Sequence, residues 1–493
     1  MNRRSSAILA ILAAGLAAVI GALGASHRSS AHERHPAAAP TPILSVGRPT
    51  GRTIAPGFLG LSFEYPAVAA YAGTNPEAVN PVLLQLIRNL SPGQAPNLRI
   101  GGDTTDWTWW PVRGMTKPLG IRYTLTPRWV RVTRALARDL GARLILGINL
   151  ELDSARDASA EARALVHGIG RNSIVGLEPG NEPELYGSFS FYRLPNGRHV
   201  TGRPSTYDFS SYLRDFSQIS RSLPKIPLVG PATGGPRWIP DLPTFLAAQP
   251  RVRLATLHKY PLQTCFLAPS DPRYPTIAHI LSPLAARGLA DSIAPSVVAA
   301  HAEHVALRID EMNSDSCGHA PGISDGFASA LWALDAVFEM ARVGVDGVNI
   351  HTYPGATYEL FKFTHRDGGW RAVVAPEYYG LEMFAQAAPP GARLLDVSGS
   401  PGSVRAWATR APNGTVHVVL INEDTARRRT LAVRIPGAHR RATLERLRGK
   451  GITATTGVTL GGASAVRASS RGYVLTLPRA SAAMLTIAPA APG

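Results

Sequence analysis

Short apolar runs rich in branched residues alternate along most of the chain with longer segments of helical periodicity. Eight such runs lie at 58–65, 97–102, 143–150, 174–183, 227–233, 254–261, 307–314 and 347–354. Between several of them, stretches such as 126–142 and 325–344 repeat apolar residues three or four positions apart, as a helix packed on one side requires. Strands that alternate with helices in this way predict an α/β fold, namely a closed (β/α)8 TIM barrel.

The pattern changes near residue 385. From there to the C-terminus, short segments of alternating apolar and polar residues are separated by Gly, Asn and Pro turns. A period of two is typical of half-buried strands, so we predict a C-terminal β-sandwich domain over 386–493. The segment 42–55 is expected to be an N-terminal strand that joins this sandwich, which leaves 56–385 for the barrel.

The N-terminus has the composition of an export signal. Arg3 and Arg4 precede an apolar run that ends in small residues, and a polar stretch rich in His and Pro follows. This order predicts a signal peptide at 1–25 and a disordered linker at 26–41. The apolar run is almost long enough to span a bilayer, so a retained anchor is the alternative. Either way we expect the folded part to be secreted, periplasmic or at the cell surface, and without stable membrane association once the signal is cleaved.

Composition narrows the choice of partners. Of the 493 residues, 45% are hydrophobic and 17% are charged, which indicates a globular protein rather than a disordered one. The net charge of +17, carried mostly by arginine, favours acidic partners, although an arginine-rich surface without a specific role is the plainer interpretation. No basic run is interleaved with aromatic residues, so nucleic acid is not an expected partner. We expect a monomer.

Two cysteines, Cys265 and Cys317, are present. In an oxidising compartment one pair can form one disulfide. Neither cysteine belongs to a C-x-x-C pair, and no histidine motif has metal-ligand spacing. The sequence therefore indicates neither a metal site nor a cofactor.

Polar residues gather at the C-terminal end of each apolar run. In a barrel these ends meet on one face, which is where barrel enzymes carry out their chemistry. For any one residue the alternative is a capped or solvated loop, but so many such endings on one face favour a common site. They are Glu64, Asp103, Asp106, Asn149, Glu151, Asn181, Glu182, His258, Tyr260, Glu311, Asn313, His351 and Tyr353.

Two glutamates in this group have the arrangement that glycosidic bond cleavage needs, since the reaction commonly uses a pair of carboxyl groups. Glu182 ends the fourth run, and strand alternation places it on the same face as Glu178. Glu311 ends the seventh run, on the same face as two apolar residues of its strand. The same alternation points Asp310 the other way, which makes Asp310 the weaker candidate.

These residues carry a resemblance to a known family. "GNEP" after the fourth strand and a glutamate at the end of the seventh look like the clan A glycoside hydrolases. Within that clan, "LRIGGDTTDWTWW" (98–110), "GLEPGNEPELY" (176–186) and "EMNSDSCGHAPGISDGFASALWALD" (311–335) resemble glycoside hydrolase family 79, whose members include β-glucuronidases and heparanase. The resemblance covers 55–385 and extends into the sandwich.

The resemblance implies an exported retaining glycoside hydrolase that removes β-linked glucuronic acid, or its 4-O-methyl form, from glycosides or polysaccharides. Glu182 would be the general acid/base and Glu311 the nucleophile of a double displacement, with their carboxyl groups about 5–5.5 Å apart. The negative charge of Glu311 would favour the protonated form of Glu182. Asn181 would contact the sugar 2-hydroxyl, and Tyr260 would donate a hydrogen bond to Glu311.

In the resembled family the loop after the nucleophile holds the sugar carboxylate, which here points to Ser316, Cys317 and Gly318. Backbone N–H groups of such a loop can hold an anion without a formal charge. Cys265 and Cys317 would lie on loops after neighbouring strands, where a disulfide would rigidify this loop; two free buried thiols are the alternative. Further candidates for sugar contacts, each as readily structural, are Glu64, Asp103, Asp106, Tyr353 and Tyr358.

Three alternatives remain open. "GISDG" (322–326) matches the G-x-S-x-G motif of serine hydrolases, but loop sequence precedes it, so Ser324 is expected to cap the following helix instead. A clan A barrel could equally act on a xyloside or an arabinofuranoside, because a fold does not fix the substrate. The chain could also be a non-catalytic binder of acidic polysaccharide that uses its positive charge.

Overall fold

The computed structural model describes residues 41–317, 320–436 and 441–489. The predicted signal peptide at 1–25, all but the last residue of the predicted linker at 26–41, and Gly318 lie outside the described residues. Within these ranges, no helix combines the length and the apolar character needed to cross a membrane.

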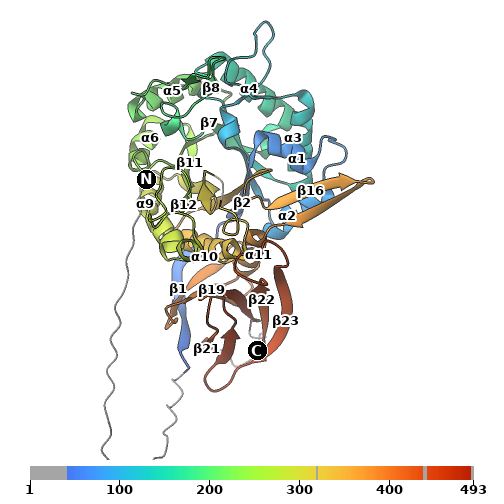
Figure 1. Cartoon of the computed structure of the whole chain (residues 1–493), viewed down its shortest axis with the longest axis vertical. Helices are drawn as coiled ribbons and strands as arrows, with labels where there is room; N and C mark the ends of the chain where they lie inside the picture. Colours follow the sequence, from blue (N-terminus) through green and yellow to red (C-terminus); the bar gives the residue numbers. More distant parts are fainter. Residues whose placement is uncertain (1–40, 318–319, 437–440, 490–493) are drawn as a thin grey trace, which may run out of the picture. The chain divides into compact units, whose positions relative to one another are not determined.

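Eight parallel strands close into a barrel in the order β10-β11-β13-β15-β2-β3-β6-β7 (Figure 1). Each of the eight apolar runs of the sequence overlaps one of these strands, so the predicted (β/α)8 barrel is confirmed. The strands are β2 (Leu59–Glu64), β3 (Asn97–Gly101), β6 (Arg143–Ile148), β7 (Ile174–Pro179), β10 (Leu228–Thr233), β11 (Val252–Lys259), β13 (Ala306–Met312) and β15 (Gly347–Thr352).

Helices surround the barrel, and local sequence sets their ends. In α3 (Pro127–Leu140), the Thr126 side chain accepts a hydrogen bond from the Trp129 N–H, proline occupies the first turn, and Gly141 ends the helix with φ +64°. The others are α1 (Tyr65–Ala72), α2 (Pro81–Leu90), α4 (Ala155–Ile169), α5 (Phe209–Ser222), α6 (Leu242–Ala248), α7 (Ile277–Ile280), α8 (Leu289–Asp291), α9 (Ala294–Ala302), α10 (Phe327–Val343) and α11 (Pro376–Ala387).

Short elements decorate the loops. Single 3-10 turns are η1 (Asp103–Thr105), η2 (Arg171–Ser173), η3 (Pro183–Leu185) and η4 (Ile239–Asp241), and η5 (Leu284–Gly288) is a π-helical turn. Four two-stranded ribbons are β4 (Thr108–Trp109) with β5 (Tyr123–Thr124), β8 (Tyr192–Arg193) with β9 (His199–Val200), β12 (Leu262–Gln263) with β14 (Asp315–Ser316), and β16 (Phe361–Arg366) with β17 (Gly369–Val374).

The predicted capping role of Ser324 is wrong. Helix α10 begins three residues later, at Phe327, and its N-terminal flanking residue is Gly326. Ser324 is fully buried instead, and its hydroxyl shares a hydrogen bond with that of Ser314 at 2.8 Å. The G-x-S-x-G match therefore lies in a packed loop, without the preceding strand that a hydrolase elbow requires.

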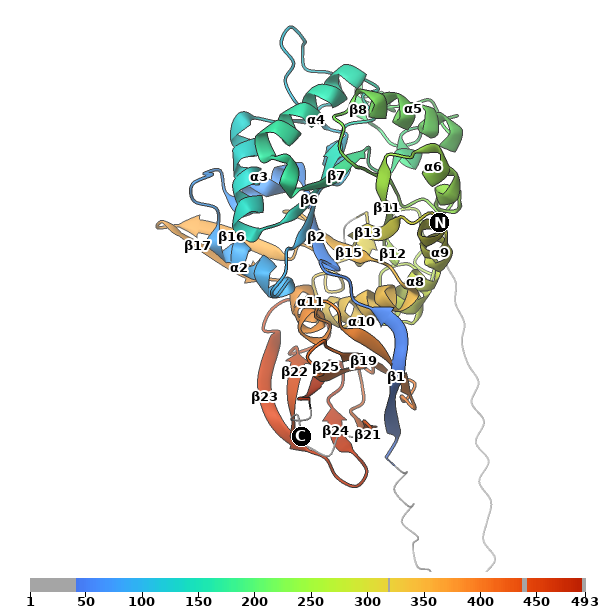
Figure 2. The same ribbon diagram turned by 180° about the vertical axis from the view of Figure 1, so that it is seen from behind.

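The C-terminal domain is one nine-stranded, mostly antiparallel sheet in the order β23-β22-β25-β20-β19-β18-β1-β21-β24 (Figure 2). Side chains from strands near both ends of this order share one core, so the sheet folds over itself as a sandwich. The strands are β1 (Ile43–Thr53), β18 (Arg393–Ser398), β19 (Val404–Arg410), β20 (Val416–Asn422), β21 (Arg429–Arg434), β22 (Arg441–Arg448), β23 (Thr459–Arg467), β24 (Tyr473–Leu477) and β25 (Ser481–Ile487).

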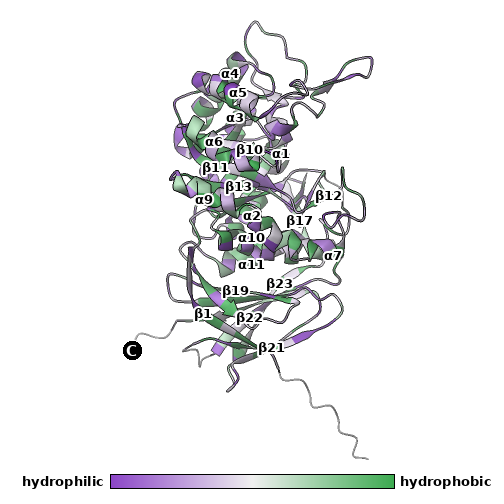
Figure 3. Ribbon diagram, turned by 90° about the vertical axis from the view of Figure 1, so that its left-hand side faces the viewer, coloured by the Kyte–Doolittle hydropathy of each residue, from purple (hydrophilic) through white to green (hydrophobic). Residues whose placement is uncertain are grey.

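Strand β1 links the start of the described chain to this sheet, because it pairs antiparallel with β18 and parallel with β21. Helices α10 and α11 lie between the barrel strands and the sheet, as the views in Figures 1 and 2 agree. The rings of Phe338 and Trp407 stack at a centroid distance of 5.4 Å, and the indole N–H of Trp407 donates to Asp335 at 2.7 Å. Figure 3 shows hydrophobic and hydrophilic residues alternating along the helices and strands.

Candidate active site

A buried arginine on β3 organises the carboxyl-terminal end of the barrel. The guanidinium of Arg99 donates to Glu178 Oε2 at 2.7 Å, to Glu311 Oε2 at 2.5 Å and to Asn181 Oδ1 at 2.8 Å. A guanidinium presents five donors in a rigid fork, so one side chain fixes the positions of acceptors from several strands. Arg99 is fully buried, which makes these charge-assisted bonds strong.

Sequence reasoning missed Arg99. It lies inside the apolar run 97–102 and was counted as part of a strand. One feature of the sequence could have indicated its role. Arg99 lies between Leu98 and Ile100 in a strand expected to be buried on both faces, and a buried charge needs a partner of opposite charge.

Glu182 and Glu311, predicted as a catalytic pair, face each other. One carboxylate oxygen of Glu182, one of Glu311 and a ring nitrogen of His258 all lie within 4.8 Å of one another. Retaining glycosidases hold their two carboxyl groups about 5–5.5 Å apart, whereas inverting enzymes keep about 6.5–9.5 Å to admit a water molecule. The two carboxyl groups are therefore close enough to act on one bond of a ligand.

Glu311 is held as a carboxylate. The Tyr260 hydroxyl donates to its Oε1 at 2.9 Å, and Arg99 donates to its Oε2. Burial works against ionisation, but the positive charges of His351, His258 and Arg99 outweigh it and hold the pKa of Glu311 well below its ordinary value. Glu311 is consequently ionised and fixed in orientation, as a nucleophile must be.

Glu182 follows β7 on a turn with unusual backbone geometry. Gly180 has φ +87° and Glu182 itself has φ +45°, in the left-handed region that residues other than glycine rarely adopt. The Glu182 N–H donates to the Ala232 carbonyl at 2.9 Å, which anchors the turn to the end of β10. The turn brings the side chains of both Asn181 and Glu182 to the same end of the barrel.

His258, on β11, connects the two glutamates. Its Nδ1 lies 3.1 Å from Glu182 Oε1 and 4.0 Å from Glu311 Oε2. Burial lowers the pKa of His258, but Glu311, the hydrogen bond to Glu182 and nearby Asp310 raise it to about 9 against the opposing charge of Arg99. The imidazole is therefore protonated at neutral pH and donates to Glu182. A protonated imidazole has no lone pair to offer a metal ion.

The predicted outward orientation of Asp310 is wrong, because β13 contains a β-bulge. Leu257 of β11 lies opposite Ile309, but His258 lies opposite Glu311, so Asp310 is an extra residue in the register. Asp310 and Glu311 consequently both reach Arg99, at 3.2 Å and 2.5 Å.

Burial and the charge of Glu178 raise the pKa of Asp310 well above its ordinary value. The pKa of Glu178 moves the other way: burial raises it, but Arg99, a hydrogen bond with Asp310 and His258 bring it below its ordinary value. The pKa values of this neighbouring pair thus move in opposite directions, and Asp310 holds its proton more tightly than Glu178 does.

Glu64 and His351 form the wall beside Glu311. Glu64 accepts hydrogen bonds from the backbone N–H groups of Asp103 at 3.1 Å and Thr104 at 2.9 Å, and its Oε1 lies 3.5 Å from His351 Nε2. Burial lowers the pKa of His351, but Glu311 and Glu64 raise it above its ordinary value. Glu64 thereby fixes both the loop after β3 and the imidazole of His351 beside Glu311.

Asp103 borders the same space. The residue is exposed to solvent, and the Asn181 amide donates to its Oδ1 at 3.4 Å. The surrounding protein, followed by the negative charges of Glu64, Glu182 and Glu311, raises the pKa of Asp103 to about 8. Asp103 is therefore a polar group near the glutamate pair that can donate a hydrogen bond to a ligand.

Asp106 was expected to contact a sugar, but its side chain is hydrogen-bonded within the protein. Its Oδ1 accepts from the backbone N–H groups of Leu150 at 2.9 Å and Glu151 at 3.1 Å, and its Oδ2 accepts from the Asn181 N–H at 3.0 Å and the Tyr186 hydroxyl at 2.7 Å. Both oxygens are used inside the protein. Asp106 holds the loops after β6 and β7 together rather than facing a ligand.

Three tyrosines line one side of the site. The ring of Tyr358 lies 6.1 Å from that of Tyr260 and 5.9 Å from that of Tyr353, measured between centroids. The Tyr353 ring also lies 5.4 Å from His351. Tyr260 and Tyr353 are partly exposed and Tyr358 is buried, so the first two can contact a ligand directly.

The loop after the nucleophile is tied to the loop after β11. Cys265 and Cys317 form a disulfide with their Cα atoms 5.9 Å apart. Ser316 pairs with Gln263 in the β12–β14 ribbon, so the bond closes a ribbon that already joins the two loops. Cys317 has φ +67°, in the left-handed region that residues other than glycine rarely adopt.

No protein-family model and no curated protein sequence matches this chain. Its fold matches that of a 4-O-α-L-rhamnosyl-β-D-glucuronidase from Fusarium oxysporum 12S, with a TM-score of 0.67 and 20% identity over 90% of this chain and 100% of that chain.

Two further structures share the fold. The GH51 arabinofuranosidase from Xanthomonas axonopodis pv. citri has a TM-score of 0.63 and 16% identity over 90% of this chain and 99% of that chain. The catalytic domain of the GH30 xylanase C from Talaromyces cellulolyticus has a TM-score of 0.53 and 14% identity, with the same coverage. The chain thus has a fold of glycoside hydrolases that act on different sugars.

Proposed function

We propose that the protein is an exported retaining glycoside hydrolase of clan A, similar to family 79, that removes β-linked glucuronic acid or its 4-O-methyl form. The observation that carries the proposal is the pair Glu182 and Glu311, whose carboxylate oxygens lie within 4.8 Å at the carboxyl end of the barrel. Export remains a prediction from the pattern of residues 1–25.

In the first step a Glu311 oxygen attacks the anomeric carbon while Glu182 gives its proton to the glycosidic oxygen. The aglycone leaves as an alcohol, and the sugar stays on Glu311 as an ester. Arg99 and Tyr260 hold the two Glu311 oxygens, which fixes the plane of the nucleophile. General acid assistance of this kind contributes about 10²–10⁴ in rate.

In the second step Glu182, now a carboxylate, takes a proton from water. The hydroxide attacks the anomeric carbon, and Glu311 leaves as a carboxylate, so the configuration is retained. Esterification removes the negative charge of Glu311, which is the strongest influence raising the pKa of His258. His258 therefore holds its proton less tightly in the intermediate than in the free enzyme.

The choice of a glucuronide rests on three supports: the sequence resemblance, the cation-rich surroundings of the site, and the fold shared with a glucuronidase. An arabinofuranoside is the second candidate, because GH51 arabinofuranosidases share the fold nearly as well. A panel of 4-nitrophenyl glycosides separates the two. We expect turnover of the β-glucuronide and not of the α-L-arabinofuranoside; the reverse would assign the second candidate.

The roles of the two glutamates are tested by trapping with a 2-fluoro-glucuronide followed by peptide mass spectrometry. We expect the label on Glu311, and a label on any other residue contradicts the assignment. With Glu182→Gln, substrates whose leaving groups need no proton should retain much more activity than poor leaving groups. Salt-sensitive polysaccharide binding that survives in Glu182→Gln and Glu311→Gln, without hydrolysis by the parent, would instead identify a non-catalytic binder.

A further inference from the structure

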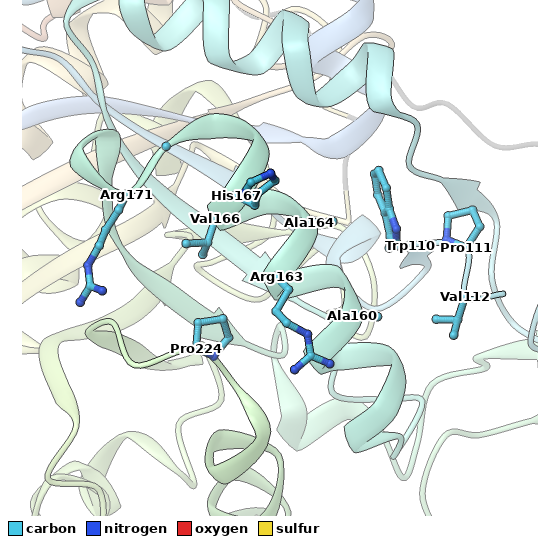
Figure 4. Close-up of a pocket in the computed structure, with 11 residues that line it drawn as sticks. Trp110, Pro111, Val112, Ala160, Arg163, Ala164, Val166, His167, Arg171 and Pro224 are labelled. Carbon is cyan, nitrogen blue, oxygen red and sulfur yellow. The ribbon is translucent and has the colours of Figure 1, made fainter.

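A groove outside the active site runs along helix α4 (Figure 4). Its volume is about 1030 Å³, and one of its walls is the helix face that carries Ala160, Arg163, Ala164 and His167. These positions follow the spacing i, i+3, i+4 and i+7, which places them on one side of a helix. The segment after β4 that begins at Trp110 forms the other wall.

A second groove of about 490 Å³ is lined by residues that adjoin those of the first in the sequence. Pro224 lines the first groove, and its neighbours Leu223 and Lys225 line the second. The Arg171 guanidinium of the first groove donates to the Lys225 carbonyl at 2.7 Å, which joins the two walls. We call the two together the basal groove.

The basal groove is lined by cations, three of which (Arg171, Arg251 and Arg253) already donate to backbone carbonyls. Neither part is lined by an acidic residue. None of its cations forms an ion pair with a carboxylate in the part of the chain that the structure describes, whereas arginines elsewhere do, as in Arg342 with Glu339. The cations are Arg163, Arg171, Arg221, Lys225, Arg251 and Arg253.

The basal groove lies away from the glutamate pair. Its lining comes largely from the segments that lead into β7, β10 and β11, at the amino-terminal ends of these strands. The catalytic candidates lie at the opposite, carboxyl-terminal ends. Only the wall at Trp110 belongs to the excursion after β3 that also carries Asp103. A ligand in the basal groove therefore does not take part in the chemistry at Glu182 and Glu311.

We propose that the basal groove is a non-catalytic docking surface for an acidic polysaccharide that carries carboxylates along its length. Charge complementarity supports this occupant, because both parts of the groove are lined by cations and neither is lined by a carboxylate. Guanidinium groups match carboxylates in a two-bond geometry. The partly exposed indole of Trp110 offers an apolar face to a sugar ring at one end.

Two other polyanions fit less well. A nucleic acid strand needs several aromatic platforms for its bases, and Trp110 is the one aromatic residue that lines either part of the groove. A membrane surface needs protruding apolar side chains, and the exposed large hydrophobic residues of the described chain lie elsewhere. The choice of a uronate polymer rests on the proposed function.

The test uses full-length protein carrying Glu311→Gln, so that hydrolysis cannot consume the probe. The variant Arg163→Ser/Arg221→Ser/Lys225→Ser removes three exposed cations whose side chains make no hydrogen bond within the described residues. The matched control, Arg410→Ser/Arg427→Ser/Arg428→Ser, removes three exposed arginines from the C-terminal sheet. Binding of polyglucuronate, heparin, neutral xylan, a single-stranded DNA oligonucleotide and phosphatidylserine vesicles is measured at low and high salt.

We expect the triple variant to bind polyglucuronate about tenfold more weakly than the parent, since each exposed pair contributes about 0.2–1 kcal/mol, and the control to bind as the parent does. The difference should shrink at high salt. Heparin reports whether sulfates serve as well as carboxylates, and neutral xylan should not bind. Equal binding by variant and control overturns the proposal, as does tighter binding of DNA or vesicles through the same three residues.

The two proposals fail separately. In the background with Glu311 intact, the triple variant should hydrolyse a small aryl glycoside at the parent rate but act more slowly on the polymer. If the parent hydrolyses no β-glucuronide and the triple variant still loses polyglucuronate binding, the proposed function fails and the docking surface stands.

Discussion

The protonated imidazole of His258 is expected to stabilise the fold in a way that disappears at high pH. Its pKa of about 9 lies above the ordinary value of 6.5, because Glu311, Glu182 and Asp310 surround it. A group whose pKa rises on folding contributes its full stabilisation below the unfolded pKa and loses it as the pH rises through the folded pKa. The contribution of His258 is therefore present below pH 6.5 and lost through pH 9.

The magnitude follows from the two pKa values. A difference between 6.5 and about 9 corresponds to about 3 kcal/mol of unfolding free energy. About 2.5 kcal/mol of this remains at pH 7, and about half a kcal/mol remains at pH 9. The substitution His258→Asn keeps a neutral N–H donor near Glu182 and removes the charge, so it isolates this contribution.

The assay is urea unfolding of the parent and of His258→Asn at pH 6, 7, 8, 9 and 10. The difference between their free energies of unfolding should fall by about 3 kcal/mol from pH 6 to pH 10. Other groups that titrate in this range, such as Asp103, are present in both proteins and cancel.

A second histidine provides the control. His417 is half-buried in the C-terminal sheet, and its burial lowers its pKa to about 4. It is neutral in the folded protein throughout this range, so His417→Asn should give a difference that is almost constant above pH 7. A difference for His258→Asn that is flat, or that grows with pH, would show that His258 is neutral in the folded protein and would refute the charge network.

Three further outcomes are expected. Arg99→Met leaves buried carboxylates without their cation and should lower the free energy of unfolding by about 3–5 kcal/mol in urea. Gly102→Ala should cost about 1–3 kcal/mol in the same assay, because φ is +74° and the added Cβ would collide with the Glu64 carboxylate. Cys265→Ser/Cys317→Ser should lose up to about 4 kcal/mol, measured by thermal unfolding, for a separation of 52 residues.

Each of these has a contradicting result. If Arg99→Met unfolds at the same free energy as the parent, Glu178 and Glu311 must become protonated in the variant with little loss of folding free energy. Wild-type stability in Gly102→Ala would mean that the loop after β3 can move away from Glu64. A reductant should shift the unfolding of the parent but not of the double serine variant, and equal shifts in both would contradict a disulfide as the cause.

The barrel was predictable because its signal is local. Strands buried on both faces read as continuous apolar runs, and the polar residue that ends each run marks the face where loops meet. Glu182 and Glu311 were found in this way, and the family resemblance assigned their roles. Strand β23 is not evident from the sequence, because Gly461 and Gly462 interrupt its alternating pattern.

The network around the two glutamates was not predictable, because its information is not local. Arg99 meets Glu178 across 79 positions and Glu311 across 212, and nothing near Arg99 in the sequence indicates either partner. The bulge at Asp310 is a property of pairing with β11 and β15, so strand alternation alone gave Asp310 the wrong side. Asp106 looked like a ligand contact because its use by backbone N–H groups depends on two distant loops.

The extra residue in β13 has a consequence for engineering. In a regular β-strand every second side chain points into the barrel, so the last two residues of a strand place only one side chain inside the barrel. By inserting Asp310 beside Glu311, this strand offers two positions in succession and places a carboxyl group with a raised pKa next to one with a lowered pKa. Moving Glu311 and Asp310 into another barrel would therefore require the β-bulge as well. In a strand of regular register, two consecutive side chains point to opposite faces, so one of the two acids would point out of the barrel.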